Sequence, residues 1–297
     1  MNNNIPLVTI IALCYNHSKY VLETLESIKN QTYTNIQLIV IDNASNDESS
    51  EKISNWIKNS EFQDVLFFPE KANLGVCPAL NKALKLTKGK YYQFISCDDI
   101  LLCDKILKQV QVFETLPDSV AFIYGNFQYI DEKSEVLDQM NQFSHNGWIY
   151  QSDLPSGRIQ SIIANNYFIS APTLLYRTNC VKEIGGYDET ISFEDFQLNL
   201  RLLGKFSCYG LIDVLCLYRV LTNSFYHSSS EIKIEKNYLH ALKYIYGNFF
   251  YENWMILLRY TLFKNSNSIK FKIIKKIIFY LLNIAEVSYK KEYGIKS

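Results

Sequence analysis

Two pairs of adjacent carboxylates are the residues of this 297-residue chain whose types and spacing point most directly to chemistry. The first pair, Asp98-Asp99, follows an apolar segment that ends at Ile95 and precedes Ile100. Neighbouring carboxylates among buried residues repel each other and lose hydration unless a cation lies between them, and oxygen ligands favour Mg²⁺ or Mn²⁺. We therefore expect a divalent cation at this pair. The alternative is that Asp98 caps the following helix and Asp99 is solvated.

The second pair, Glu194-Asp195, follows a turn at Gly185-Gly186 and begins a segment that we expect to be helical over residues 194–203. A helix dipole favours negative charge in the first turn. We expect the dipole to lower the pKa of a carboxylate there and keep it ionised, as a general base must be at neutral pH. The alternative is a helix cap beside a solvated Glu194.

The secondary-structure elements that must position these residues can be read from the spacing of apolar residues, which follows two alternating patterns over the first 125 residues. Apolar segments of strand type are separated by segments whose apolar residues recur at helical spacing. The expected strands cover residues 7–13, 36–41, 65–68, 91–95 and 120–124. This alternation predicts an α/β fold with a mostly parallel sheet and helices on both faces. Further along, the pattern favours a helix over 158–166, strands at 173–176 and 207–218, and helical structure from 231 to the end.

Polar side chains follow four of the expected strands at the point where each strand ends. Ligands of parallel sheets bind at this carboxyl edge, so we expect these clusters to converge there. Each cluster alone has a simpler reading as a turn or helix cap, which favours the same residue types. The candidate binding residues in these clusters are Tyr15, Asp42, Asn43, Asn73 and Asp98.

Composition and missing motifs exclude several classes of protein. Apolar residues make up 48% and the formal net charge is +0, which argues against intrinsic disorder and against a general nucleic-acid binder. The chain lacks G-x-S-x-G, G-x-x-x-x-G-K-[ST] and G-x-G-x-x-G, and its four His form no zinc pattern. The seven Cys contain no C-x-x-C pair and suit buried thiols in a reducing cytoplasm.

Charge is unevenly distributed along the chain, because residues 264–297 hold eight Lys and only two Glu, and this basic tail indicates a composition boundary. We expect a domain over 1–225, divided into halves at 1–100 and 101–225, followed by a helical and basic region over 226–297. Within 269–284, apolar residues line one helical face and Lys272, Lys275 and Lys276 gather on the other. Such a helix can lie in an anionic membrane surface, or it can pack its apolar face on the enzyme itself. No apolar run is long enough to span a membrane.

Several motifs in order resemble the family 2 glycosyltransferases, which are inverting enzymes with the Rossmann-like GT-A fold. Residues 8–16 resemble the first strand and the turn that contacts the base. Residues 27–33 resemble S-x-x-x-Q-T-[YF], residues 40–47 the D-[DN]-x-S-x-D loop, and residues 94–101 the D-x-D region. The resemblance covers about 5–225 and is greatest to the bacterial branch that builds O-antigen and capsule.

The resemblance implies a single displacement. Asp195 would take the proton from an acceptor hydroxyl, with Glu194 beside the acceptor, and Asp98 and Asp99 would hold Mn²⁺ or Mg²⁺ at the leaving diphosphate. The donor would be a UDP-sugar carrying a hexose, with glucose the best guess. The acceptor would be a sugar on a lipid (undecaprenyl) diphosphate, which implies a cytoplasmic enzyme peripheral to the inner face of the cell membrane.

The same resemblance implies which residues hold the donor. Tyr15 and the pair Asp42-Asn43 would hold the uracil base, and Asn73 and Asp98 would contribute to the nucleotide-sugar site.

Three departures from the family pattern stand in the sequence. Ser96 occupies the first position of D-x-D, Asn43 replaces a second Asp in its loop, and Leu221 stands where many relatives carry His, with His227 six residues later.

Two other functions stay open: a nucleotide-sugar-binding module without catalysis, and a nucleotidyltransferase. The second would need a Gly-rich basic loop after the first strand, which residues 13–19 do not supply.

Overall fold

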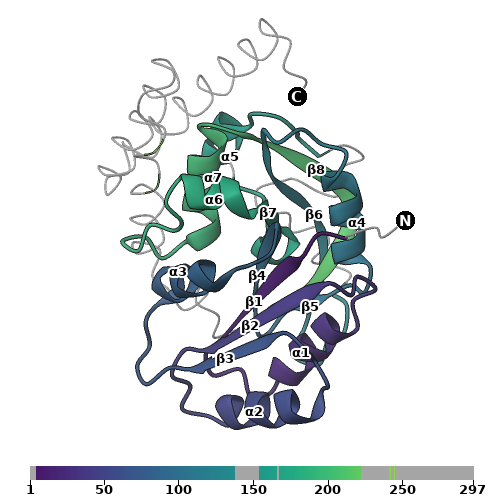
Figure 1. Cartoon of the computed structure of the whole chain (residues 1–297), viewed down its shortest axis with the longest axis vertical. Helices are drawn as coiled ribbons and strands as arrows, with labels where there is room; N and C mark the ends of the chain where they lie inside the picture. The colour runs from purple at the N-terminus through teal and green to yellow at the C-terminus, as the bar shows by residue number, and fades with distance from the viewer. Residues whose placement is uncertain (1–4, 138–153, 166, 222–240, 242–243, 245–297) are drawn as a thin grey trace, which may run out of the picture. The chain divides into compact units, whose positions relative to one another are not determined.

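The computed structural model describes residues 5–137, 154–165 and 167–221, together with Ala241 and Tyr244 (Figure 1). The chain divides into one unit over residues 1–244 and a second over 245–297. The expected amphipathic tail helix and His227 lie outside the described residues, and the boundary near 225 stays a prediction. Within the described part, no helix has the length and apolar character needed to cross a membrane.

The described strands form an eight-stranded sheet in the order β3-β2-β1-β4-β7-β6-β8-β5. Their bounds are β1 Val8–Cys14, β2 Ile36–Asp42, β3 Val65–Pro69, β4 Tyr91–Ser96, β5 Ile100–Leu101, β6 Val120–Ile130, β7 Leu175–Arg177 and β8 Ser207–Arg219. The helices are α1 Val21–Lys29, α2 Ser49–Asn59, α3 Val76–Leu86, α4 Lys105–Phe113, α5 Gln160–Asn165, α6 Thr178–Glu183 and α7 Glu194–Leu203, with a 3₁₀ turn, η3, at Ala171–Thr173.

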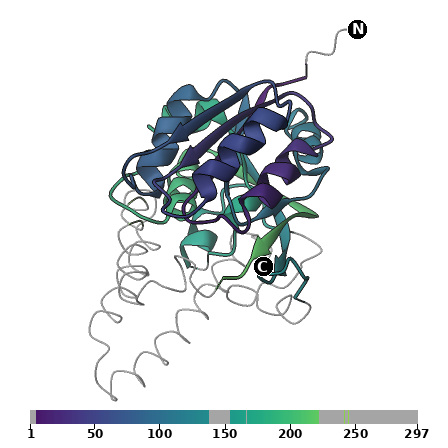
Figure 2. The ribbon, with the colours of Figure 1, turned by 90° about the horizontal axis from the view of Figure 1, so that it is seen from below.

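The parallel half of the sheet matches the sequence prediction. Strands β3, β2, β1 and β4 pair in parallel, and every residue of β1 and β2 is buried. Apolar residues of α1, α2 and α4 pack with alternate β1 residues in one core, and α1 and α2 lie side by side on that face (Figures 1 and 2). Helix α3 contacts β1 and β2 with its own buried face. The expected fold, a mostly parallel α/β sheet covered on both faces, is confirmed.

The second half of the sheet departs from the expected elements in three places. The strand expected at 120–124 runs on to Ile130, because β6 pairs in parallel with β8 from Val120 through Ile130, across register shifts. The strand expected at 173–176 is η3 followed by the three-residue β7, which pairs antiparallel with β4 and β6. Helix α6 and the short β5, antiparallel to β8, were not expected.

Candidate active site

Strand register brings the predicted polar clusters to one edge of the sheet. Cys14 at the end of β1 is level with Asp42 at the end of β2, and Leu13 is level with Ser96 at the end of β4. Asp42 is level in turn with Pro69 of β3. The loops that carry the candidate binding residues therefore start side by side, as the parallel sheet predicted.

The loops after β1 and β2 are tied together by their own side chains. The backbone N–H of Asn16, a residue with φ of 57°, donates to Ser45 Oγ at 2.9 Å, and the N–H of Asn46 donates to Asn16 Oδ1 at 2.9 Å. Ser45 Oγ also donates to Asp42 Oδ1. Asp42 itself is buried, at 2% exposure, whereas Tyr15 in the loop after β1 is 45% exposed.

Asn43 and Asn73 hold the loop that follows β3. Asn43 Nδ2 donates to Asn73 Oδ1 at 3.1 Å, and Asn43 Oδ1 accepts from the backbone N–H of Leu74 at 2.9 Å. Asn73 Oδ1 accepts a second bond, from the N–H of Gly75 at 2.8 Å. Both ends of the Asn43 amide are thus used within the protein, and of the candidate residues Tyr15, Asp42 and Asn43 it is Tyr15 that is exposed.

The two members of the first acidic pair have different surroundings. The Asp99 side chain is buried, and its Oδ1 accepts from the backbone N–H of Arg219 at 2.9 Å. Burial and then the charge of Asp98 raise the pKa of Asp99 well above its usual range. Asp98 is partly exposed, and its Oδ1 is a buried atom with no hydrogen-bond partner in the described part of the chain. Asp98 therefore has an oxygen to offer, whereas Asp99 Oδ1 is engaged with the fold.

Arg219, at the end of β8, fixes this segment, and nothing in the sequence pattern singled it out. Its side chain is fully buried. Nε donates to the Asp98 carbonyl at 2.8 Å, one terminal nitrogen donates to the Asp131 carbonyl at 2.8 Å, and the other pairs with Glu23 of α1 at 2.5 Å. The guanidinium also lies 4.5 Å from the ring centre of Tyr20. One side chain thereby joins α1, the β4–β5 turn and the end of β6.

The second acidic pair occupies the first turn of α7, as expected, but its pKa shift is opposite to the expected one. Burial raises the pKa of both Glu194 and Asp195, and the charge of Asp195 adds to the rise at Glu194. A hydrogen bond with Tyr167 and a backbone N–H bond from Phe196, at 2.7 Å to Asp195 Oδ1, oppose the rise at Asp195. Desolvation outweighs the helix dipole, although both residues keep partial exposure.

A turn seated on α3 sets where α7 begins. Gly185 and Gly186 have φ of 83° and 74°, which glycine tolerates without strain. Asn81 of α3 donates to the Tyr187 carbonyl and accepts from the Tyr187 N–H, each at 2.9 Å. From the last turn of α7, Arg201 donates to the carbonyls of Ile184 and Gly186. The spacing of Gly185-Gly186 before the acidic pair was visible in the sequence; the role of Asn81 was not.

Charges from both acidic pairs act on one residue, Tyr218. Burial, followed by the charges of Asp99, Asp98 and, more weakly, Asp195, raises the pKa of Tyr218. On the other side, Cys77 in the first turn of α3 donates to the Ile191 carbonyl at 3.0 Å, and the charge of Glu194 adds to the effect of burial in raising its pKa.

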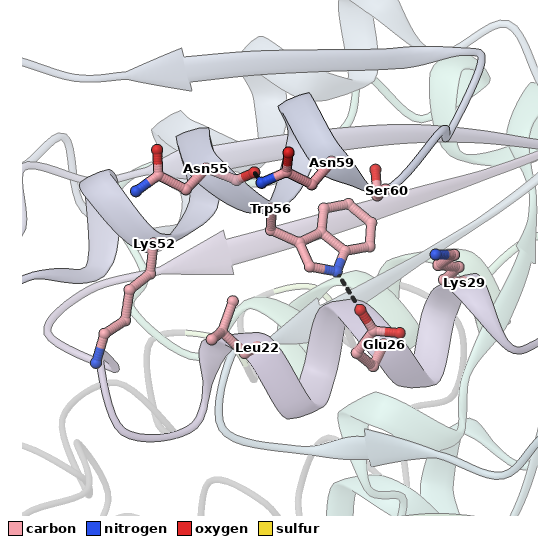
Figure 3. Close-up of a pocket in the computed structure, with 8 residues that line it drawn as sticks. All are labelled: Leu22, Glu26, Lys29, Lys52, Asn55, Trp56, Asn59 and Ser60. Carbon is pink, nitrogen blue, oxygen red and sulfur yellow. Dashed lines mark hydrogen bonds between the residues drawn. The ribbon is translucent and has the colours of Figure 1, made fainter.

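A separate groove of about 400 Å³ lies between α1 and α2 and contains none of the predicted site residues. Trp56 of α2 reaches across it and donates its indole N–H to Glu26 of α1 at 2.6 Å, as Figure 3 shows. The indole N–H of Trp56 is therefore already hydrogen-bonded within the protein, and we interpret this groove as part of the packing between α1 and α2.

The residues at the sheet edge fit a metal that is shared with a ligand. No group of three His, Cys, Asp or Glu side chains in the described part of the chain is arranged to hold an ion by itself. Mg²⁺ and Mn²⁺ sites that serve nucleotides commonly use one or two carboxylates and take the remaining ligands from phosphate and water. The unpartnered Asp98 Oδ1 provides one such carboxylate oxygen.

Comparison with known sequences finds one family over most of the described unit. The profile described as glycosyl transferase family 2 matches residues 9–185. An uncharacterized glycosyltransferase of Rickettsia typhi is 30% identical over 74% of this chain and 65% of its own length, so the chain spans just under two thirds of that relative. TuaG of Bacillus subtilis, which is named for teichuronic acid biosynthesis, is 27% identical over 80% of this chain and 87% of its own length.

Solved structures of glycosyltransferases share the fold. TarS of S. aureus, in complex with UDP-GlcNAc, superposes with a TM-score of 0.59 at 19% identity, covering 84% of this chain and 70% of its own. A mannosyltransferase of Pyrobaculum calidifontis, in complex with GDP-Man and Mn²⁺, gives 0.56 at 14% identity, covering 99% and 89%. At these identities the likeness establishes the fold.

Proposed function

Because the chain belongs to glycosyl transferase family 2, we propose that it is a metal-dependent inverting enzyme that moves a hexose from a UDP-sugar to a sugar acceptor. The observation that carries the proposal is the convergence of the two acidic pairs. Asp98 follows β4, at the sheet edge where a nucleotide diphosphate would lie, and the charges of Asp98 and, more weakly, Asp195 both add to the rise in the pKa of Tyr218. A donor and an acceptor held between them would meet one metal-binding and one proton-accepting carboxylate.

The nucleotide part of the donor would lie over the loops that follow β1, β2 and β3. Tyr15 offers an exposed ring for stacking on uracil. The carboxylate of Asp42, at the end of β2, would accept from the base N–H. Asn43 and Asn73 would act by fixing the shape of this loop, since their amides bond to each other.

The metal would be held through Asp98, whose backbone is fixed by the hydrogen bond from Arg219 to its carbonyl. A bound Mn²⁺ or Mg²⁺ supplies electrostatic stabilisation of the leaving diphosphate. Asp99 as a second ligand stays a prediction. The geometry favours Asp98, because Asp99 Oδ1 already accepts from the Arg219 N–H.

The acceptor hydroxyl would give its proton to Asp195. A carboxylate whose pKa is raised toward the working pH is a better base than an ordinary one. Of the two acids in this turn, Asp195 has the smaller burial-driven rise, because Tyr167 and a backbone N–H stabilise its charge. Glu194 would stay protonated longer and could donate a hydrogen bond to the acceptor.

The finer identity of the substrates rests on the relatives. TuaG supports a role in the synthesis of cell-wall polysaccharide. We propose a sugar on a lipid diphosphate as the acceptor, in O-antigen, capsule or a related polymer, at the cytoplasmic membrane face. Glucose is the proposed hexose, and the UDP-GlcNAc bound by TarS makes an N-acetylated hexose the competing choice.

A panel of UDP-sugars tests the proposal. Purified protein is incubated with each donor, Mn²⁺ and a lipid-diphosphate sugar, and release of UDP is measured. Acceptor-dependent release from one hexose donor is expected. Binding of UDP without any release would favour a nucleotide-sugar-binding module, and formation of diphosphate from a nucleoside triphosphate and a sugar phosphate would favour a nucleotidyltransferase.

A further inference from the structure

The imidazole of His17 faces Asp98 across a gap that no hydrogen bond fills. His17 Nδ1 lies 3.8 Å from Asp98 Oδ1, which is too long for a hydrogen bond. Both atoms are buried, and neither has a hydrogen-bond partner in the described part of the chain. Buried polar atoms are nearly always partnered, so two that face each other need an explanation.

The backbone holds His17 in this position independently of its ring. Its N–H donates to Ser49 Oγ of α2 at 3.0 Å, and its carbonyl accepts from the N–H groups of Tyr20 and Val21 at 2.9 Å each, where α1 begins. Asp98 is held from the other side by the Arg219 bond to its carbonyl. The two side chains are 20% and 13% exposed, so each lies near the surface although the two facing atoms are buried.

An imidazole nitrogen and a carboxylate oxygen both coordinate divalent cations of the first transition row. We propose that His17 is a ligand of the divalent cation at Asp98, placed there by the β1–α1 loop. The inference rests on the proposed metal-dependent function and adds to it a residue that neither the acidic motif nor the missing histidine at Leu221 identified.

A nitrogen ligand has a consequence for the choice of metal. Mg²⁺ is a hard cation that prefers oxygen ligands, whereas later divalent metals bind imidazole more strongly. A site built from Asp98, His17, diphosphate and water should therefore prefer Mn²⁺ to Mg²⁺. A site built from Asp98 and oxygen ligands alone should show a smaller preference.

The competing explanation is an ion pair, in which a protonated His17 only neutralises Asp98. The two explanations predict opposite signs. Removing a metal ligand weakens binding of the cation, whereas removing a competing positive charge leaves the binding unchanged or strengthens it.

The test measures binding of Mn²⁺ and of Mg²⁺ to the full-length protein in the presence of UDP, by titration calorimetry and by the electron paramagnetic resonance signal of free Mn²⁺. The variants are His17→Ala, His17→Gln, the reference Asp98→Asn and the control Lys19→Ala. Lys19 is an exposed cation two residues further along the same loop. Circular dichroism of each variant reports whether the protein is folded.

We expect His17→Ala to weaken Mn²⁺ binding by at least about 10-fold, the lower end of what loss of a group around a metal costs. Added imidazole should restore part of the Mn²⁺ binding that is lost in His17→Ala. It should not increase Mn²⁺ binding by Lys19→Ala or by Asp98→Asn. His17→Gln, which offers only an oxygen, should lose the preference for Mn²⁺ over Mg²⁺.

Unchanged or tighter Mn²⁺ binding in folded His17→Ala, with binding lost in Asp98→Asn, would overturn the assignment of His17 and leave the proposed metal site intact. No Mn²⁺ binding by the wild-type protein with UDP would overturn both. If His17→Ala is not folded, His17→Gln decides by its Mn²⁺ to Mg²⁺ ratio: a ratio equal to that of the wild type would overturn the assignment.

Discussion

Burial, more than position on a helix, sets the charge of the carboxylates at this site. Glu194 begins a helix, where the dipole favours an anion, yet its pKa is raised by the surrounding protein and by Asp195. Asp99 has its pKa raised in the same way, and Asp98 is the carboxylate with an unpartnered oxygen. Each acidic pair therefore combines one carboxylate that the fold constrains with one that can act on a ligand.

Glu194 should make the protein less stable as the pH rises. Its folded pKa is raised above its unfolded value, so the native state holds the proton more tightly and stability falls as pH passes from the unfolded pKa through the folded one. Glu194→Gln does not titrate. Its melting temperature should therefore exceed that of the wild type by more at pH 8 than at pH 5. Calorimetric melts at both pH values measure this, with Glu51→Gln on the exposed face of α2 as the control. Equal differences at both pH values would show that Glu194 is not desolvated.

The two members of the first pair should separate in a metal-binding experiment. Asp98→Asn removes the charge of the unpartnered oxygen and should weaken Mn²⁺ binding in the presence of UDP by about 10-fold or more. Asp99→Asn keeps an oxygen that can accept from the Arg219 N–H and should bind Mn²⁺ almost as the wild type does. Titration calorimetry distinguishes the two. An equal loss in both variants would make Asp99 a ligand as well.

At the scale of elements, the parallel half of the sheet could be predicted and the rest could not. Strands β1 and β2 are buried along their whole length, so the local apolar pattern carries the information. Strand β6 runs past Tyr124 because it pairs with β8, which comes about 90 residues later in the chain. No local periodicity records a partner at that distance.

The candidate site, like the sheet, could be predicted only as far as local sequence patterns reach. Strand ends and acidic pairs were visible in the sequence, and the strand register brings the ends of β1, β2 and β4 level at one edge. The difference between Asp98 and Asp99 depends on Arg219, 120 residues away from Asp99. The raised pKa of Asp195 depends on burial, which the helix pattern alone does not report.

The placement of α7 should depend on a glycine without a side chain at position 186. A Cβ there would lie 2.6 Å from Asn81 Oδ1, and φ is +74°. Gly157 offers a matched control, because its φ is +96° but a Cβ would meet nothing within 4 Å. Gly157→Ala should cost about 1–2 kcal/mol from backbone strain alone. Gly186→Ala should cost more, because the Asn81 contact must also give way.

Urea unfolding of both glycine variants measures these costs, and turnover measures the effect on the site. We expect the loss of activity to be confined to Gly186→Ala. Equal destabilisation of the two variants would mean that the Asn81 contact does not set the position of the turn.

At the scale of the whole molecule, charge is the feature that would connect the protein to the membrane-bound acceptor proposed above. The last 34 residues carry eight Lys and two Glu, although the net charge of the chain is +0. The predicted amphipathic helix would place Lys272, Lys275 and Lys276 against anionic lipid. Each contributes about 1 kcal/mol near such a surface.

Replacing these three lysines with Gln in the full-length protein should therefore weaken binding to anionic vesicles by about 3 kcal/mol, or roughly 100-fold, at low salt. Cosedimentation with anionic and neutral vesicles measures the effect. The wild-type protein should lose its binding to anionic vesicles as salt is raised. Equal binding by the wild type and the triple variant at low salt would place the lysine face in solvent and the apolar face on the protein itself.

The central claim is that the two acidic pairs form one transfer site in which Asp195 is the base. The rate of sugar transfer from the best UDP-sugar donor with Mn²⁺, measured for the wild type and for Asp195→Asn under donor saturation, tests it most directly. The account predicts a rate lower by about 10²–10⁴-fold in Asp195→Asn, the usual cost of losing a placed base, with unchanged affinity for UDP. It also predicts that wild-type activity falls as pH drops through a pKa above that of an ordinary aspartate, because the base must be ionised. A variant that kept more than about a tenth of the wild-type rate would contradict the account.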